Sequence, residues 1–259
     1  MFRKSTLFTL FALMVFCIQY PPLMGSENDI HQEVNKAKAK LQEGINSWNV
    51  EKIRSAKDMF LNLLLKEDSE NVYFHYYIAL CDYRLVTYEM SENLTEEAGR
   101  NTVDAQKHLK KVMELKPTWG EPFALYASTV GLEIALDWNK AMSLSSEIYE
   151  YFGKAYDLDP KNPRINLLKG SSDLYTPVEY GGGPDVAIGT LSHAVELFEE
   201  ENVQNPLEPS WGKEEALTFL GIAYQQKGNN SKARELFLKA LEINPEFGLA
   251  IDSLEQLKK

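Results

Sequence analysis

Few residues of this 259-residue chain have the types and spacing that chemistry requires. No Gly-x-Ser-x-Gly turn is present, and carboxylates in runs such as "FEEEN" are typical of a solvated helix face. The histidines occur singly, without a second His or Cys at the spacing that would place two metal ligands on one helix face: His31, His75, His108 and His193. We therefore expect no catalytic centre, no metal site and no cofactor.

A glycine triplet in "YTPVEYGGGPDVAIG" is the first loop that could bind a ligand. Free amides at a helix start can hold an anion, and Pro184 suits the first helical position. A phosphate loop needs Lys-Ser or Lys-Thr after its glycines, whereas Pro184 and Asp185 follow here, and Asp185 would repel phosphate. The sequence favours a conformational role for Gly181–Gly183.

A tryptophan in "NPLEPSWGKEEAL" marks the second such loop. Trp211 has the ring to stack on a ligand. Ser210 and Trp211 nevertheless stand directly before a helical pattern, where a capping residue and an apolar staple are expected. We favour the interpretation that this loop anchors the start of the helix.

The helices that would carry these loops follow a regular pattern of small and apolar residues. In the stretch 214–247, small residues stand where two antiparallel helices must approach closely, and aromatic residues flank them. This pattern resembles the tetratricopeptide repeat, a 34-residue helix-turn-helix unit, at Leu220, Gly221, Tyr224, Ala233, Phe237, Ala240 and Pro245. One such hairpin cannot bury its apolar face alone, so neighbouring repeats are required.

Weaker copies of the second helix occur upstream. Their equivalent positions are Ala56, Ala105, Ile148, Ala187 and Ala233, which are separated by 49, 43, 39 and 46 residues instead of 34. The first three excesses fall within repeats, around 85–100, 131–143 and 176–183, and should emerge on one edge of the array. The fourth lies between repeats, nearer the opposite edge. Insertions on one face of a repeat array often form its binding side.

The predicted fold is all-α, a right-handed α-solenoid of about five tetratricopeptide-like repeats with insertions and a C-terminal capping helix. The expected boundaries are a signal peptide at 1–25 and one domain at 26–259. Within that domain we expect repeats at about 30–69, 70–119, 120–162, 163–205 and 214–247, then the cap at 248–259.

The N-terminal segment has the layout of a secretory signal peptide. Arg3 and Lys4 precede an apolar run from about Leu7 to Tyr20, followed by two prolines and small residues. An uncleaved membrane anchor is the alternative, but the run is short of the roughly 20 residues that span a bilayer. We expect export to the periplasm or beyond the cell, in a bacterial envelope, and no membrane span after cleavage.

The mature chain would carry 25 basic and 38 acidic residues, a formal charge of −13, which disfavours nucleic acid as a partner. It would keep one cysteine, Cys81, so an internal disulfide is excluded and stability must come from packing.

Tetratricopeptide arrays, by this resemblance, present their first helices as a concave groove for peptides or protein segments. Projected onto this sequence, the candidate groove residues are Arg164, Leu167, Ser171, Tyr175, Thr218, Ile222 and Gln225. We predict a non-enzymatic scaffold or adaptor that binds a protein or peptide partner. The alternative is a small-molecule-binding helper of a transporter, similar to the tetratricopeptide-type T component of TRAP uptake systems. A closed apolar tunnel would favour that alternative. The sequence does not specify the oligomeric state.

Overall fold

The structure, a computed structural model, describes residues 27–258 and is helical in the way the sequence predicts. Within that range there are no strands, and two 3-10 turns, η1 (Trp138–Lys140) and η2 (Val178–Tyr180), supplement the α-helices. The α-helices are α1 (Glu27–Asn46), α2 (Val50–Lys66), α3 (Val72–Ser91), α4 (Thr95–Leu115), α5 (Glu121–Leu136), α6 (Ala141–Leu158), α7 (Pro163–Tyr175), α8 (Pro184–Glu200), α9 (Lys213–Gln226), α10 (Asn230–Ile243) and α11 (Gly248–Gln256). The expected signal peptide at 1–25 lies outside the described residues.

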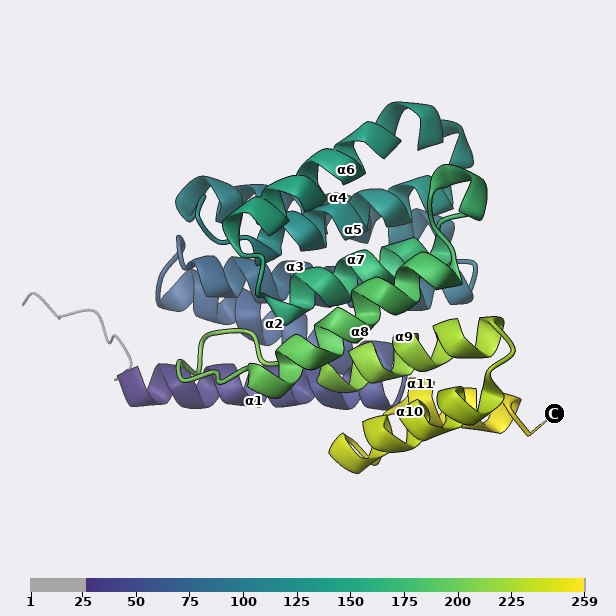
Figure 1. The fold of residues 1–259 in the computed structure, drawn as a ribbon. Helices are drawn as coiled ribbons and strands as arrows, with labels where there is room; N and C mark the ends of the chain where they lie inside the picture. The colour runs from purple at the N-terminus through teal and green to yellow at the C-terminus, as the bar shows by residue number, and fades with distance from the viewer. Residues whose placement is uncertain (1–26, 259) are drawn as a thin grey trace, which may run out of the picture.

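Successive helices form antiparallel hairpins that stack side by side (Figure 1). Each odd-numbered helix from α1 to α9 packs against the helix that follows it. Helix α5 also contacts α3 and α7, and α7 contacts α9, so these helices form the inner layer of the array. No helix in the described part of the chain combines the length and apolar character that crossing a bilayer demands.

Small residues determine how closely the hairpin partners approach. A Cβ atom added to Gly221 on α9 would lie 2.4 Å from a ring carbon of Phe237 on α10. The corresponding atom on Gly170 of α7 would lie 2.6 Å from Leu191 of α8. Ala233, where the repeat pattern predicts a helix contact, is fully buried. The predicted small-residue positions are therefore places where helices touch.

The first predicted insertion is not a loop. Helix α3 runs to Ser91 and α4 begins at Thr95, so the extra residues around 85–100 lengthen the two helices to 20 and 21 residues. The sequence "TEEAGR" places two acidic residues in the first turn of α4, where they favour the helix dipole. The second, around 131–143, is mostly helical as well, because only residues 137–140, with η1, separate α5 from α6. The third is a short irregular segment that contains η2, and both 3-10 turns lie at one end of the stack (Figure 1).

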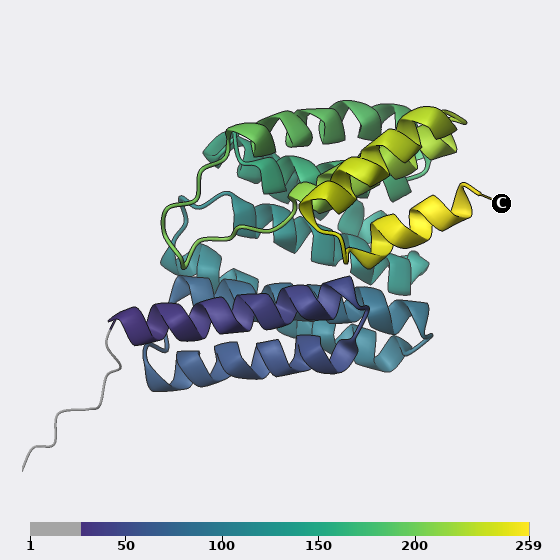
Figure 2. The same ribbon diagram turned by 90° about the horizontal axis from the view of Figure 1, so that it is seen from below.

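The fourth extra segment, residues 201–212, crosses the opposite end of the stack, and we call it the strap (Figure 2). It connects α8 to α9. Helix α1 packs against the strap and the C-terminal repeat. Lys38 donates a hydrogen bond to the strap, Gln42 donates to Glu214 of α9, and the side chains of Asn46 and Asn244 bond each other. Helix α1 also contacts α11, so the first and last helices of the array meet.

Candidate functional site: a filled concave face and an exposed aromatic edge

The predicted groove residues do not lie together on an open surface. Arg164, Leu167 and Thr218 are buried inside the array, each less than 4% exposed, so they cannot line a groove that a partner reaches. The three side chains that remain partly accessible are Ser171, Ile222 and Gln225. Tyr175 alone of the seven is largely exposed, and its ring meets that of Phe219 edge to face, with centroids 6.4 Å apart.

Arg164 is buried on the face formed by the inner helices α3, α5, α7 and α9, which we call the concave face. Its Nε donates to Glu121 Oε2 at 2.9 Å and one of its terminal nitrogens donates to the Trp211 carbonyl at 3.0 Å. A bidentate pair with Glu201 completes the guanidinium's partners. Two carboxylates therefore raise the pKa of Arg164 against the opposing effect of its burial. This arginine holds the strap to α5 and α7 and is not free to bind a ligand.

Trp211 fills the space that a groove ligand would occupy. Its indole Nε1 donates to the Tyr76 hydroxyl at 3.0 Å, and the Arg84 guanidinium lies over its ring, 4.9 Å from the centroid. The Tyr76 hydroxyl in turn donates to Glu121. Trp211 is 8% exposed, in agreement with an anchoring role, whereas Ser210 makes no cap because Gly212 occupies the N-cap of α9.

The glycine triplet has a conformational role. Gly181 and Gly183 have φ of 84° and 98°, and a Cβ on Gly182 would lie 2.2 Å from the Thr176 carbonyl oxygen. All three backbone amides donate to carbonyls within the same turn or at the end of α7. They are therefore not available to hold an anion.

Exposed apolar side chains gather instead at the end of the stack opposite the strap. We call them the edge patch, and each is more than half exposed: Trp138, Tyr149, Val178 and Tyr180. The rings of Trp138 and Tyr180 lie 6.2 Å apart, and the Tyr149 hydroxyl donates to the Tyr180 carbonyl at 3.1 Å. Two insertions, η1 and η2, thus bring aromatic side chains from separate repeats together.

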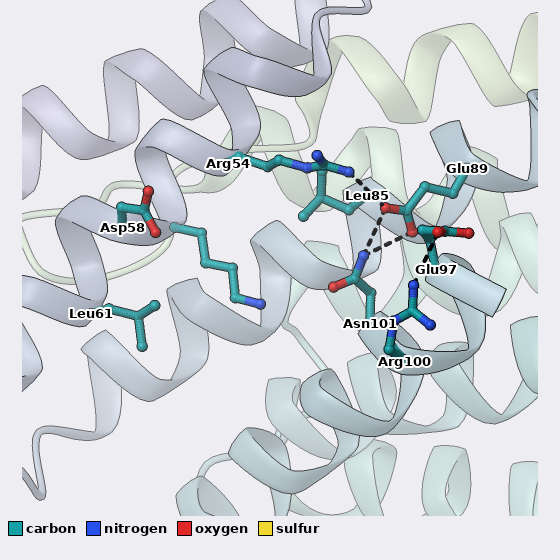
Figure 3. A pocket seen from close by; sticks show the side chains of 9 residues that line it. Arg54, Asp58, Leu61, Leu85, Glu89, Glu97, Arg100 and Asn101 are labelled. Atoms are coloured by element: carbon teal, nitrogen blue, oxygen red, sulfur yellow. Dashed lines mark hydrogen bonds and ion pairs between the residues drawn. The ribbon is translucent and has the colours of Figure 1, made fainter. Parts of the chain in front are cut away.

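A second candidate is a charged cleft of about 480 Å³ between α2, α3 and α4 (Figure 3). Its basic groups are already paired. Arg54 lies 3.3 Å from Glu89 Oε1, Asn101 donates to both oxygens of Glu89 at 2.8 Å, and Arg100 pairs with Glu97. Because Glu89 is fully buried, these bonds satisfy a charge that the fold itself places there. The arrangement resembles an ion-pair network more than a binding site for an anion.

Two pairs of ionisable groups were not evident from spacing alone. His75 and His108 are 33 residues apart in sequence, yet their Nδ1 atoms lie 2.7 Å apart. Burial and the neighbouring His75 lower the pKa of His108 to about 4. Asp82 is fully buried with Lys57 Nζ at 2.5 Å, and burial raises the pKa of this carboxyl to about 7. Only the pairing of α3 with α4 and α2 brings these residues together.

Comparison with known proteins identifies the repeat. Residues 214–247 match the family model of the tetratricopeptide repeat. They form a tetratricopeptide repeat. The structure is similar to the HusA haemophore from Porphyromonas gingivalis, with a TM-score of 0.65 and 21% identity over 78% of this chain and 96% of that one.

It is also similar to TTC0263, a thermophilic tetratricopeptide-repeat protein from Thermus thermophilus. The TM-score is 0.56 with 15% identity, over 86% of this chain and 100% of that one. No curated protein matches the chain. The predicted α-solenoid of tetratricopeptide-like repeats is thereby confirmed as the fold.

Proposed function

We propose that this protein is an exported, non-enzymatic interaction module that binds a protein partner at its edge patch. The observation that carries the proposal is the set of exposed aromatic side chains that two insertions bring to one edge. Exposed apolar groups that gather on one surface are typical of interaction sites. The concave groove expected from the repeat pattern is not the proposed site, because Trp211 and the strap fill its interior.

The chemistry of the edge patch suits a protein partner. Tryptophan and tyrosine dominate the binding energy of protein interfaces, because their large rings bury apolar area while their polar atoms keep hydrogen bonds. Two of the four patch residues are tyrosines. A partner segment with apolar side chains and a few hydrogen-bonding groups would match this surface.

The proposal is tested by capture of the partner from an envelope extract of the producing cell. The wild-type protein is compared with the double variant Trp138→Ser/Tyr180→Ser and with Leu65→Ser, which removes an exposed apolar side chain on α2. We expect one partner, identified by mass spectrometry, to be captured by the wild type and by Leu65→Ser and to be lost with the double variant. Equal capture by all three proteins would contradict the proposed site.

A planar small molecule is the second candidate ligand. The similarity to a protein described as a haemophore favours it, as does the Trp138–Tyr180 pair of exposed rings. Titration with haemin should then give a saturable absorbance change with the wild type and none with Trp138→Ser/Tyr180→Ser. The transporter-helper alternative called for an apolar tunnel, whereas the cleft of Figure 3 and the cleft beside the strap are lined mainly by charged and polar side chains.

A further inference from the structure

The strap interacts with the repeats as a bound peptide would. It is an irregular segment, "ENVQNPLEPSWG", held by side chains of α1, α3 and α7. Lys38 Nζ donates to the carbonyls of Pro206 and Glu208 at 3.1 and 2.9 Å. The Tyr77 hydroxyl donates to the same Glu208 carbonyl at 3.0 Å. Main-chain oxygens of the strap thus satisfy donors from two different repeats.

The side chains of the strap add an anchor at each end. At its start, Glu201 forms the bidentate pair with Arg164. At its end, Trp211 inserts between Tyr76 and Arg84, and Pro209 beside it is also buried. A carboxylate, a buried proline and a tryptophan, on a backbone that turns at residues 205–208, are the features by which a helical-repeat surface could select a segment.

Two positive charges on the concave face, those of Lys38 and Arg164, are satisfied by acceptors of the strap. Lys38 and Arg164 lie near each other, and burial together with Arg164 lowers the pKa of Lys38 to about 8. The bonds from Lys38 in this region go to strap carbonyls. Without the strap, a half-buried ammonium and a guanidinium would lose acceptors that another acidic segment could supply.

The strap does not fill the whole face. A cleft of about 270 Å³ remains between its residues, Glu201–Val203 and Glu208–Pro209, and the starts of the inner helices. Tyr73, Lys116 and Trp119 form the far wall of this cleft. The strap is therefore bordered by open space on one side, where a competing segment could begin to displace it.

We infer that the concave face is a recognition site for an acidic, proline-containing segment with a tryptophan anchor, and that the strap occupies this site in cis. A partner with such a segment binds only when the strap is displaced. The site is distinct from the edge patch, and its test does not depend on the edge patch or its partner.

The experiment uses a fluorescent peptide with the sequence of residues 203–212, VQNPLEPSWG, as the probe. In one variant of the whole chain, residues 203–210 are replaced by a Gly/Ser linker of equal length, together with Trp211→Ala. We expect this variant to keep its helical circular dichroism and to bind the peptide saturably, at least tenfold more tightly than the wild type. Adding Lys38→Met should weaken that binding at least tenfold, whereas Trp138→Ser/Tyr180→Ser should leave it unchanged.

A second variant keeps the strap sequence intact, in case the linker variant does not fold. Lys38→Met alone removes two bonds to strap carbonyls, so amide exchange in residues 203–211 should accelerate. A folded linker variant that does not bind the peptide, or binding that is insensitive to Lys38→Met, would overturn the inference. Failure of the linker variant to fold, together with unchanged amide exchange in Lys38→Met, would show that the strap is only part of the core.

Discussion

At the scale of single residues, glycines provide a matched test of helix packing. Gly221→Ala would force a Cβ atom into the Phe237 ring, and we expect it to lower the free energy of unfolding by about 1–3 kcal/mol. In Gly189→Ala on α8 the added Cβ atom has no neighbour within 4 Å, and we expect this variant to raise the free energy of unfolding by up to about 1 kcal/mol through helix propensity. Urea unfolding of both variants measures the difference, and effects of the same sign would show that the α9–α10 contact is looser than described.

The histidine pair predicts how stability depends on pH. The pKa of His108 is lowered from 6.5 to about 4, so the folded state favours the neutral ring. The stability associated with the neutral ring is fully present above about pH 6.5. As the pH falls from 6.5 towards 4, the free energy of unfolding decreases, because the unfolded chain binds a proton that the folded chain does not. Asp82, with its pKa raised to about 7, increases the free energy of unfolding as the pH falls over the same range, because here the folded chain binds the extra proton.

His108→Gln therefore should lose less stability than the wild type between pH 7 and pH 5, since Asp82 acts equally in both proteins. Urea unfolding at the two pH values provides the measurement, and His193→Gln, which changes a ring exposed on α8, is the control. If the wild type and His108→Gln lost the same stability on acidification, the ring of His108 would not be held neutral by the fold.

At the scale of elements, the sequence predicted the helices well because each has a strong local signal. The pattern of Gly221, Ala233 and Phe237 specifies a hairpin within 34 residues, and the structure contains it. The extra residues around 85–100 were harder to place, because spacing alone does not distinguish a loop from two longer helices. Local propensity at the start of α4 settled that choice in favour of helix.

The edge on which the strap lies agrees with its predicted place between repeats, but its contacts could not be predicted, because they join distant parts of the chain. Lys38 and Glu208 are 170 residues apart, and no local pattern relates them. The same reason explains the groove residues: projection from the repeat named Arg164 and Thr218 as groove-lining, but both are buried because the inside of this array is filled by its own chain. Tyr175 stayed exposed because it lies at the end of α7, away from the strap.

Trp211→Phe tests whether the strap stabilises the array. The change removes the indole donor to Tyr76 and part of the ring under Arg84, so we expect a loss of about 1–3 kcal/mol in the free energy of unfolding. Trp138→Phe, at a ring that is largely exposed, should change it by less than about 0.5 kcal/mol. Equal effects in chemical denaturation would mean that the strap contributes little to the fold.

At the scale of the whole molecule, the array joins its first helix to its last. Asn46 at the end of α1 exchanges side-chain hydrogen bonds with Asn244, and a Cβ on Gly248 would lie 2.6 Å from the Asn46 carbonyl oxygen. An open solenoid leaves its concave face free, whereas here the strap lies on that face and the first and last helices meet. The proposed partner site is therefore on the outer edge, and the concave face would accept a partner only when the strap is displaced.

The central claim is that the edge patch contacts a protein partner, and site-specific photocrosslinking in the producing cell tests it most directly. Benzoylphenylalanine is placed at position 180, in the patch, or at position 65, which is also accessible, on α2. We predict a discrete crosslinked adduct from position 180 and none from position 65. No adduct at position 180, or the same adduct at both positions, would contradict the assignment of the edge patch as the binding surface.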